Sequence, residues 1–145
     1  MRGVAFDEAT GDVIVAGYGS ANSITIGTTT VPCSGDGPLW VARLSAADGS
    51  PVWLKTFERA GDITNPMRVR VARDGNIFIT GPFFPLMTVG TYSLAANSSP
   101  APFVMSLTGT GNVRWAHGWP GVNGHSSMAY DLAVDNQDGT LVAVS

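Results

Sequence analysis

The sequence predicts an all-β fold of short antiparallel strands. Apolar and polar residues alternate with a period of two over short segments, which is typical of strands with one buried face. Turn pairs such as Asp48-Gly49 and Asp74-Gly75 separate these segments. No segment shows the 3.6-residue period of a helix, and helices are further disfavoured by Pro82, Pro85, Pro100, Pro102 and Pro120.

An internal repeat organises these segments. A seven-residue block occurs three times, and its copies begin at Gly11, Gly75 and Gly139, a spacing of 64 residues. The last residue of the first two copies is Gly17 and Gly81, and Ser145 takes that place in the third. Repeats of this kind indicate a fold built from stacked copies of one unit.

A second block extends the repeat through most of the chain. Trp40 aligns with Phe103, and Trp53 aligns with Trp115. We therefore expect a single domain over residues 1–145, with one repeat at about 3–66, a second at about 67–127 and the start of a third at about 128–145.

The expected strands fit the blade of a β-propeller. The first repeat predicts strands at 3–7, 12–19, 23–31, 38–46 and 51–58. The second predicts them at 67–73, 76–84, 87–94, 101–108 and 113–119, and the third at 128–135 and 140–145. Such a set of short antiparallel strands is the size of a propeller blade. A β-sandwich also fits the strand spacing, but it does not require a repeat.

A propeller blade must bury its sheet faces against its neighbours. The apolar residues that recur at matching places are therefore the expected core between blades: Phe6, Val71 and Val134 in one set, and Ile14, Phe78 and Val142 in the other. Trp40 and Phe103 are also expected in the core.

Two segments resemble a known repeat family. Residues 40–57 read WVARLSAADGSPVWLKTF and residues 69–81 read VRVARDGNIFITG. They resemble the "FVAKLD-SGN-LW-K-FG" and "VAVD-SGNVYVTG" blocks of bacterial SBBP-type β-propeller repeats. The resemblance implies a propeller in a secreted or surface-anchored bacterial protein, with no assigned reaction.

Residues 44–53 are also similar to the tryptophan-docking motif of PQQ-type propellers. In that family the glycine forms the turn and the tryptophan packs against the next blade, which implies a structural role for Trp53 and Trp115. The chain lacks an adjacent cysteine pair and a recognisable set of calcium and quinone ligands. No cofactor is therefore expected.

Three residues are candidate ligand contacts. Trp119 lies in a Gly-Trp-Pro-Gly segment, where a loop tryptophan is available to a ligand. His117 and His125 are the two histidines, and their spacing of eight does not match a helical zinc motif. We expect exposed loop histidines, with ligand contact as the alternative.

Other polar segments predict no chemistry. The acidic run at 135–139 lacks the twelve-residue pattern and terminal glutamate of an EF-hand, so we read it as a hairpin turn and expect no metal site. Cys33 has no histidine nearby in the sequence, and no Gly-x-Ser-x-Gly motif occurs. We therefore expect no catalytic residues and no enzyme activity.

Composition and charge restrict the kinds of partner and the cellular location that we expect. The net charge is −3 and the isoelectric point is near 5.1, which argues against a nucleic-acid surface. No apolar run is long enough for a membrane span. The N-terminus lacks a signal-peptide pattern, which leaves a cytoplasmic protein, a removed signal or an internal piece open. The family resemblance implies an extracellular or cell-surface location.

Two full repeats and the start of a third do not close a ring of about four to eight blades. The expected partners are further blades of a longer chain or identical chains that complete a ring. We expect a non-enzymatic propeller segment with a structural or binding role. A carbohydrate-binding propeller built from several chains is the alternative, and a degenerate quinoprotein fragment is a third reading. Segments 19–37 and 82–101 differ between the copies, which disfavours an identical site in each blade.

Overall fold

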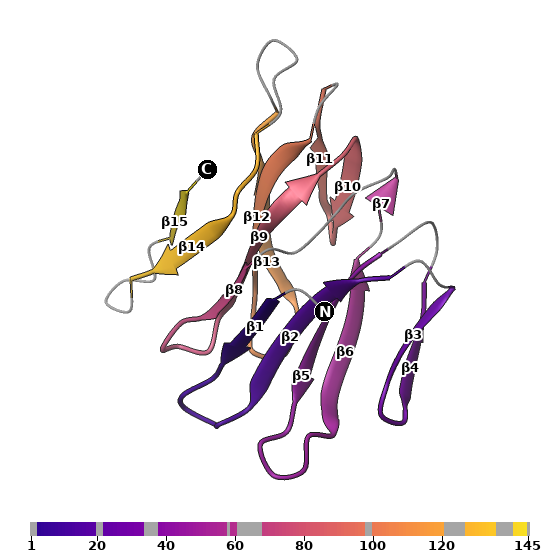
Figure 1. The fold of residues 1–145 in the computed structure, drawn as a ribbon, viewed down its shortest axis with the longest axis vertical. Coiled ribbons are helices and arrows are strands. Elements are labelled where there is room, and N and C mark those ends of the chain that lie inside the picture. Colours follow the sequence, from indigo (N-terminus) through magenta and orange to yellow (C-terminus); the bar gives the residue numbers. More distant parts are fainter. Residues whose placement is uncertain are drawn as a thin grey trace.

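A computed structural model describes residues 3–19, 22–33, 38–57, 59–60, 68–97, 100–120, 127–135 and 141–144. Within these ranges the fold is all-β and every strand pair is antiparallel, as the sequence predicted (Figure 1). No helix of the described chain is long and apolar enough to cross a membrane.

Two four-stranded sheets form the body of the molecule. Sheet 1 has the order β1-β2-β5-β6 and comprises β1 (Gly3–Phe6), β2 (Val13–Tyr18), β5 (Leu39–Leu44) and β6 (Pro51–Phe57). Sheet 2 has the equivalent order β8-β9-β12-β13 and comprises β8 (Arg68–Val71), β9 (Ile77–Phe83), β12 (Ala101–Leu107) and β13 (Val113–Gly118). A hairpin of β14 (Asp131–Val134) and β15 (Leu141–Val144) follows.

Equivalent residues of the two repeats pair with one another in the same register in sheet 1 and in sheet 2. Gly17 lies opposite Trp40 in sheet 1, and Gly81 lies opposite Phe103 in sheet 2. Trp53 and Trp115 likewise pair with equivalent residues of β5 and β12, each beside a register shift. The two sheets are therefore superimposable copies of one topology.

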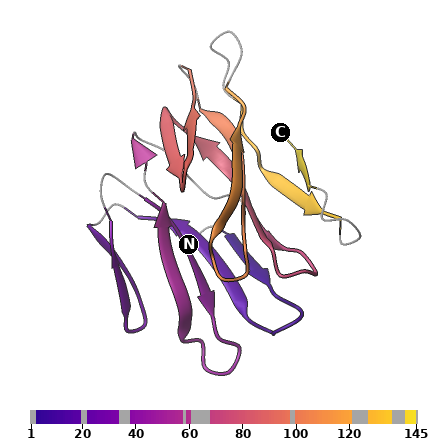
Figure 2. The same cartoon turned by 180° about the vertical axis from the view of Figure 1, so that it is seen from behind.

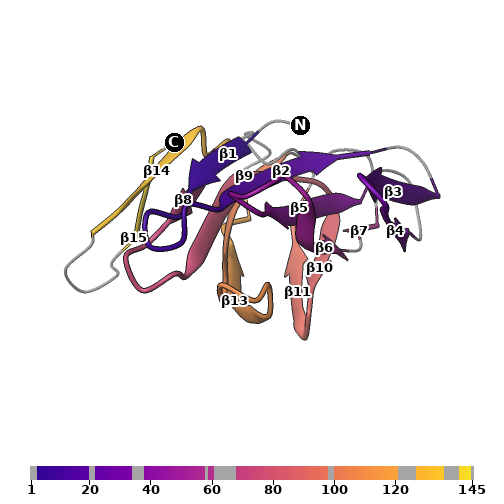
Figure 3. The same ribbon diagram turned by 90° about the horizontal axis from the view of Figure 1, so that it is seen from below.

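The first strands of the successive units lie side by side. β8 contacts both β1 and β14, and Figure 3 shows the units fanning outward from this line, with β6 and β13 far from it. The approach of β1 to β8 is close, because a Cβ on Gly3 would lie 2.6 Å from a methyl carbon of Val69. A side chain at position 3 would therefore force the strands apart.

The main core lies between the two sheets. One face of sheet 1 packs on one face of sheet 2, and this cluster includes the fully buried residues Ile14, Val41, Val69, Ile77, Ile79, Phe103 and Met105. A smaller cluster joins sheet 2 to β14 through Phe78 and Leu132. Sheet 2 therefore packs one face on sheet 1 and the other on the β14–β15 hairpin.

The segments expected as single strands at 23–31 and 87–94 are hairpins instead. The first is β3 (Ser23–Ile26) and β4 (Thr29–Pro32), and the second is β10 (Leu86–Val89) and β11 (Tyr92–Ala95). Gly27 and Gly90 occupy the turns with φ of 57° and 60°, a conformation that L side chains rarely adopt. The same hairpin therefore stands at the same place in both repeats, although the sequences differ (Figure 2).

A short strand that the sequence did not predict completes this region. β7 (Arg59–Ala60) follows sheet 1 in the chain but pairs with β10, so the second hairpin is part of a three-stranded sheet. Two residues are too few to give a periodic pattern, which explains why the sequence contained no signal for it.

The expected core between blades needs one correction. Phe6 is 62% exposed, because among the described residues no sheet lies over β1 on this face, and the β3–β4 hairpin packs only on the cluster of Val15, Ala42 and Leu54. Ile14 and Phe78 are buried, and Val71 and Val134 are half-buried. The side chain of Val142 lies outside the described part of the chain.

Candidate functional site

Three aromatic side chains form a row along β13 and just beyond its end. We call Trp115, His117 and Trp119 the aromatic stripe. The ring centroids of Trp115 and His117 are 5.5 Å apart, and those of His117 and Trp119 are 6.5 Å apart. Phe78 on β9 extends the row, with its ring centroid 6.0 Å from that of Trp115. The structure thus brings together two of the three predicted ligand contacts, His117 and Trp119.

Exposure increases along the aromatic stripe. Trp115 is half-buried against the cluster that holds Phe78 and Leu132. His117 is exposed, and Trp119 is 51% exposed. No described residue accepts a hydrogen bond from the Trp115 indole N–H. The outer part of the stripe is therefore an apolar surface open to a partner.

The equivalent row in sheet 1 has a partner within the chain. Trp53, Lys55 and Phe57 occupy the places of Trp115, His117 and Trp119. The Trp53 Nε1 donates a hydrogen bond to the Gly109 carbonyl at 3.0 Å, and the Lys55 Nζ donates to the Asn112 Oδ1 at 2.9 Å. Phe57 is only 6% exposed. The turn between β12 and β13 thus packs on Trp53 and Lys55 of this row.

The turn between β12 and β13 has little room for a side chain where it contacts sheet 1. A Cβ on Gly111 would lie 3.2 Å from both the Trp53 ring and the Lys55 chain, and φ at Gly111 is 78°. Glycine is therefore required there for both conformation and fit.

A buried ionic cluster lies at the same junction. The Arg43 Nη2 donates to the Asp7 Oδ2 at 2.7 Å and to the Thr10 hydroxyl at 2.7 Å, and the Arg43 Nε donates to the Asp12 Oδ2 at 2.6 Å. The Arg43 Nη1 also donates to the Gly109 carbonyl at 3.1 Å. Arg43 on β5 therefore ties the turn between β1 and β2 to the turn between β12 and β13.

The cluster favours the charged form of Asp12. The hydrogen bond from Arg43 and the backbone hydrogen bond from Ala46 hold the pKa of Asp12 below its ordinary value of 3.8. In sheet 2 the place of Arg43 is taken by Ser106, whose hydroxyl accepts a hydrogen bond from Arg114 at 3.1 Å. The ionic cluster is therefore not repeated in sheet 2.

A weaker ionic contact connects β8 to β14. The Arg68 Nε lies 2.8 Å from the Asp131 Oδ1, and both side chains are close to half exposed. The backbone N–H of Leu132 and the Arg68 side chain lower the pKa of Asp131. Because the pair is exposed, solvent screens it, and its contribution to stability is small.

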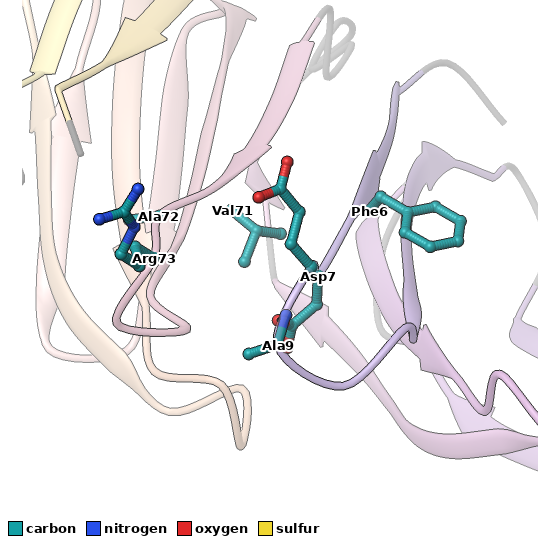
Figure 4. A pocket seen from close by; sticks show the side chains of 7 residues that line it. Phe6, Asp7, Ala9, Val71, Ala72 and Arg73 are labelled. Carbon is teal, nitrogen blue, oxygen red and sulfur yellow. Dashed lines mark hydrogen bonds between the residues drawn. The ribbon is translucent and has the colours of Figure 1, made fainter.

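A pocket opens between the ends of β1 and β8. It has a volume of about 220 Å³ and is lined by Phe6, Asp7, Glu8, Ala9, Val71, Ala72 and Arg73. Figure 4 shows that the lining comes from two equivalent places, the turn after β1 and the turn after β8. The Asp7 carboxylate forms an ion pair with Arg43, so it already has a partner within the protein.

The structure places the remaining predicted residues in structural positions. Phe103 is fully buried, and Trp40 is half-buried with its indole over Gly17. Gly11 and Gly75 lie in turns with φ near 80°. Gly81 is buried on β9. Gly139 and His125 lie outside the described residues.

Sequence reasoning missed two features of this region. The Arg43 cluster joins residues that are far apart in the sequence, and no spacing rule links them. The β10–β11 hairpin did carry a signal, because Val89-Gly90-Thr91 matches Ile26-Gly27-Thr28 at a spacing of 63 residues. That short match predicts a shared turn.

Comparison with known proteins gives no family. No family model matches the chain, and no curated protein matches it at a significant level.

Proposed function

We propose that the chain is a non-catalytic segment of a β-propeller, in which sheet 1, sheet 2 and the β14–β15 hairpin are successive blades. Its role is to hold binding loops on a rigid scaffold. The setting that accords with the sequence resemblance is the surface of a bacterial cell or the extracellular space. The proposal assigns no reaction, cofactor or metal to the chain.

The proposal rests on a comparison of how exposed equivalent residues are on β1, β8 and β14. Val4, Val69 and Leu132 occupy the same register position on β1, β8 and β14. Val69 is 0% exposed beneath sheet 1 and Leu132 is 2% exposed beneath sheet 2, whereas Val4 is 56% exposed. Each first strand is thus buried by the sheet that precedes it, and only β1 lacks such a sheet among the described residues. This is the expected pattern for stacked blades.

The experiment tests whether the uncovered face of sheet 1 is a blade-stacking face. We would measure solution mass by light scattering and binding of an apolar dye, for the full chain and for the double variant Val4→Glu, Phe6→Glu. We expect self-association or dye binding in the original chain and loss of both in the variant, because charge on this face opposes apolar contact.

A double variant with the same added charge serves as the control. Thr28→Glu, Ser93→Glu places both glutamates on exposed hairpin positions outside sheet 1. It is expected to behave like the original chain. A monomer that binds no dye, or a Val4→Glu, Phe6→Glu variant that behaves like the original chain, would contradict the proposal.

A carbohydrate-binding propeller is the second candidate. The observation that favours it is the exposed Trp119 ring beside His117, because a flat aromatic face with a polar neighbour suits a sugar ring. Quenching of tryptophan fluorescence by a set of oligosaccharides tests it. Saturable quenching that disappears in Trp119→Ala supports this role, and no quenching contradicts it.

A further inference from the structure

We propose that the pocket between the ends of β1 and β8 binds a small zwitterion with an apolar side chain, either a free amino acid or a dipeptide. The carboxylate of Glu8 would bind the ammonium group of this ligand, and the guanidinium of Arg73 would bind its carboxylate. The apolar part of the lining would contact the ligand's side chain. The site does not depend on further blades, because its lining comes from the ends of two strands that are both described.

The pocket is built from two copies of the same positions of the repeat. Residues 6–8, where β1 ends, and residues 71–73, where β8 ends, take equivalent places. The first of the three positions is apolar in both copies, whereas the third is Glu8 in one copy and Arg73 in the other. The charge at this position therefore reverses between the repeats, and the pocket has one negative and one positive wall.

Both charges are available to a ligand. Glu8 and Arg73 are exposed, and neither side chain forms an ion pair or a hydrogen bond with another described residue. Figure 4 shows Arg73 and Ala72 on the β8 side of the pocket and Ala9 on the β1 side, with Val71 between them. Two opposite charges that line one pocket without pairing can each form a charge-assisted hydrogen bond with a different end of one molecule.

The size and the lining of the pocket restrict the ligand further. Its volume of about 220 Å³ lies below the range of about 300–1,000 Å³ that is usual for drug-sized ligands. Phe6, Val71 and Ala72 contribute an apolar surface between the two charges. A neutral sugar would leave both charges without a partner, and an inorganic anion would leave Glu8 without one. A small zwitterion with an apolar side chain satisfies all parts of the lining.

Both walls are held by hydrogen bonds within their own turns. The Asp7 Oδ1 accepts a hydrogen bond from the backbone N–H of Ala9 at 3.1 Å, and the Asp7 carbonyl accepts one from the N–H of Gly11 at 2.7 Å. On the other wall, the N–H of Ala72 donates to the Asn76 carbonyl at 2.8 Å. The pocket is therefore formed before a ligand arrives, which reduces the cost of ordering it on binding.

Methyl NMR of the full chain would follow titrations with valine and, separately, with the dipeptide Ala-Val. We expect saturable shifts of the methyl signals of Ala9, Val71 and Ala72 with at least one of the two, with a Kd of about 1 mM for so small a ligand. The methyl signals of Val113 and Ala116, on the outer strand of sheet 2, should not move. Binding of valine alone identifies a free amino acid as the ligand, and binding of Ala-Val alone identifies a dipeptide.

Two modified ligands test whether both charges are needed. N-acetyl-valine lacks the ammonium group, and valine amide lacks the carboxylate. For a site that binds valine, each is expected to bind about tenfold more weakly, because it leaves one charged group of the pocket without a partner. The N-acetylated and amidated forms of Ala-Val serve the same purpose for a site that binds the dipeptide.

Exchange of the two charges tests the walls themselves. Glu8→Arg and Arg73→Glu each give the pocket two like charges and should weaken binding about tenfold. The double variant Glu8→Arg, Arg73→Glu has one charge of each sign again, and it should recover binding with the ligand reversed. Asp48→Arg and Arg114→Glu make the same changes at exposed positions outside the pocket and should leave the affinity unchanged.

Three outcomes would overturn the inference. The first is the absence of saturable shifts with both zwitterions, and the second is a double variant that binds no better than either single variant. The third is equal binding of the N-acetylated ligand, which would leave only an anion site at Arg73. The blade-stacking test measures self-association and dye binding instead, so either proposal can fail while the other stands.

Discussion

Sheet 1 and sheet 2 share one strand order, one register and one set of turns, yet they differ in what covers them. In sheet 2 the face toward the preceding unit is largely buried, with Val69, Ile77 and Met105 at 0% exposure. In sheet 1 the same face leaves Val4 and Phe6 more than half exposed. The difference shows that burial in a repeat fold depends on the neighbouring unit rather than on the pattern within a unit.

The hairpins that stand beside the sheets follow the same rule. Met87, Val89 and Leu94 of β10–β11 are buried in the core between the sheets. Ile24, Ile26 and Val31 of β3–β4 are only half-buried, against the less covered face of sheet 1. Equivalent hairpins thus belong to a deep core in one repeat and to a shallow one in the other.

Removing Arg43 is expected to have the largest effect, because it breaks the junction that only sheet 1 has. Arg43→Met should lower the free energy of unfolding by about 3 kcal/mol, since the buried Asp7 loses its charged partner. Urea denaturation followed by tryptophan fluorescence would measure it. Arg68→Met is the matched control at an exposed ion pair, and a loss under about 1 kcal/mol is expected there. Equal losses in the two variants would show that burial of the Arg43 cluster is unimportant.

Truncating equivalent valines sharpens the comparison of the two faces. Val69→Ala should cost about 2 kcal/mol, because it leaves a cavity between the sheets. Val4→Ala, at the same register position of sheet 1, should cost less than about 0.5 kcal/mol because its side chain is 56% exposed. Chemical denaturation of both variants at a low protein concentration would test the pair. A large cost for Val4→Ala in the monomer would mean that sheet 1 is covered by part of its own chain.

The smallest expected effect is on acid stability, and it again separates sheet 1 from sheet 2. The pKa of Asp12 is lowered in the folded state, so its stabilising contribution is complete above pH 3.8 and is lost as the pH falls through the lower, folded value. In Asp12→Asn this contribution is absent at every pH. Below about pH 3.8 the original chain should therefore lose stability more steeply than the variant. Thermal unfolding between pH 2 and pH 6 would compare the slopes, and parallel slopes would contradict the assignment of the cause to Arg43 and Ala46.

Much of the fold could be predicted from the sequence because its signals are local and repeated. Alternation and turn glycines predicted the positions of β2, β5, β9 and β12 closely, and the alignment of Trp40 with Phe103 gave the correct register. The alternation did not distinguish the hairpins β3–β4 and β10–β11 from single strands, because it continues through the turn glycines Gly27 and Gly90.

The candidate site was less predictable, for a physical reason. Trp119 and His117 were predicted as ligand candidates, but whether this row is covered depends on a turn from another part of the chain, as the turn on the equivalent Trp53 and Lys55 shows. That turn comes from the next unit, more than 50 residues later in the chain. Likewise, the exposure of Phe6 depends on whether another sheet packs over β1, so no pattern within its own repeat could predict it.

The short strand β7 determines how this chain can be divided into modules. It directly follows sheet 1 in the sequence, but its only described pairing is with β10 of the second repeat. A protein engineer who cuts after Phe57 therefore keeps β7 with the unit that it stabilises, whereas a cut just before β8 would leave β10 with one strand fewer. Arrays assembled from this chain should accordingly join their building blocks between β6 and β7.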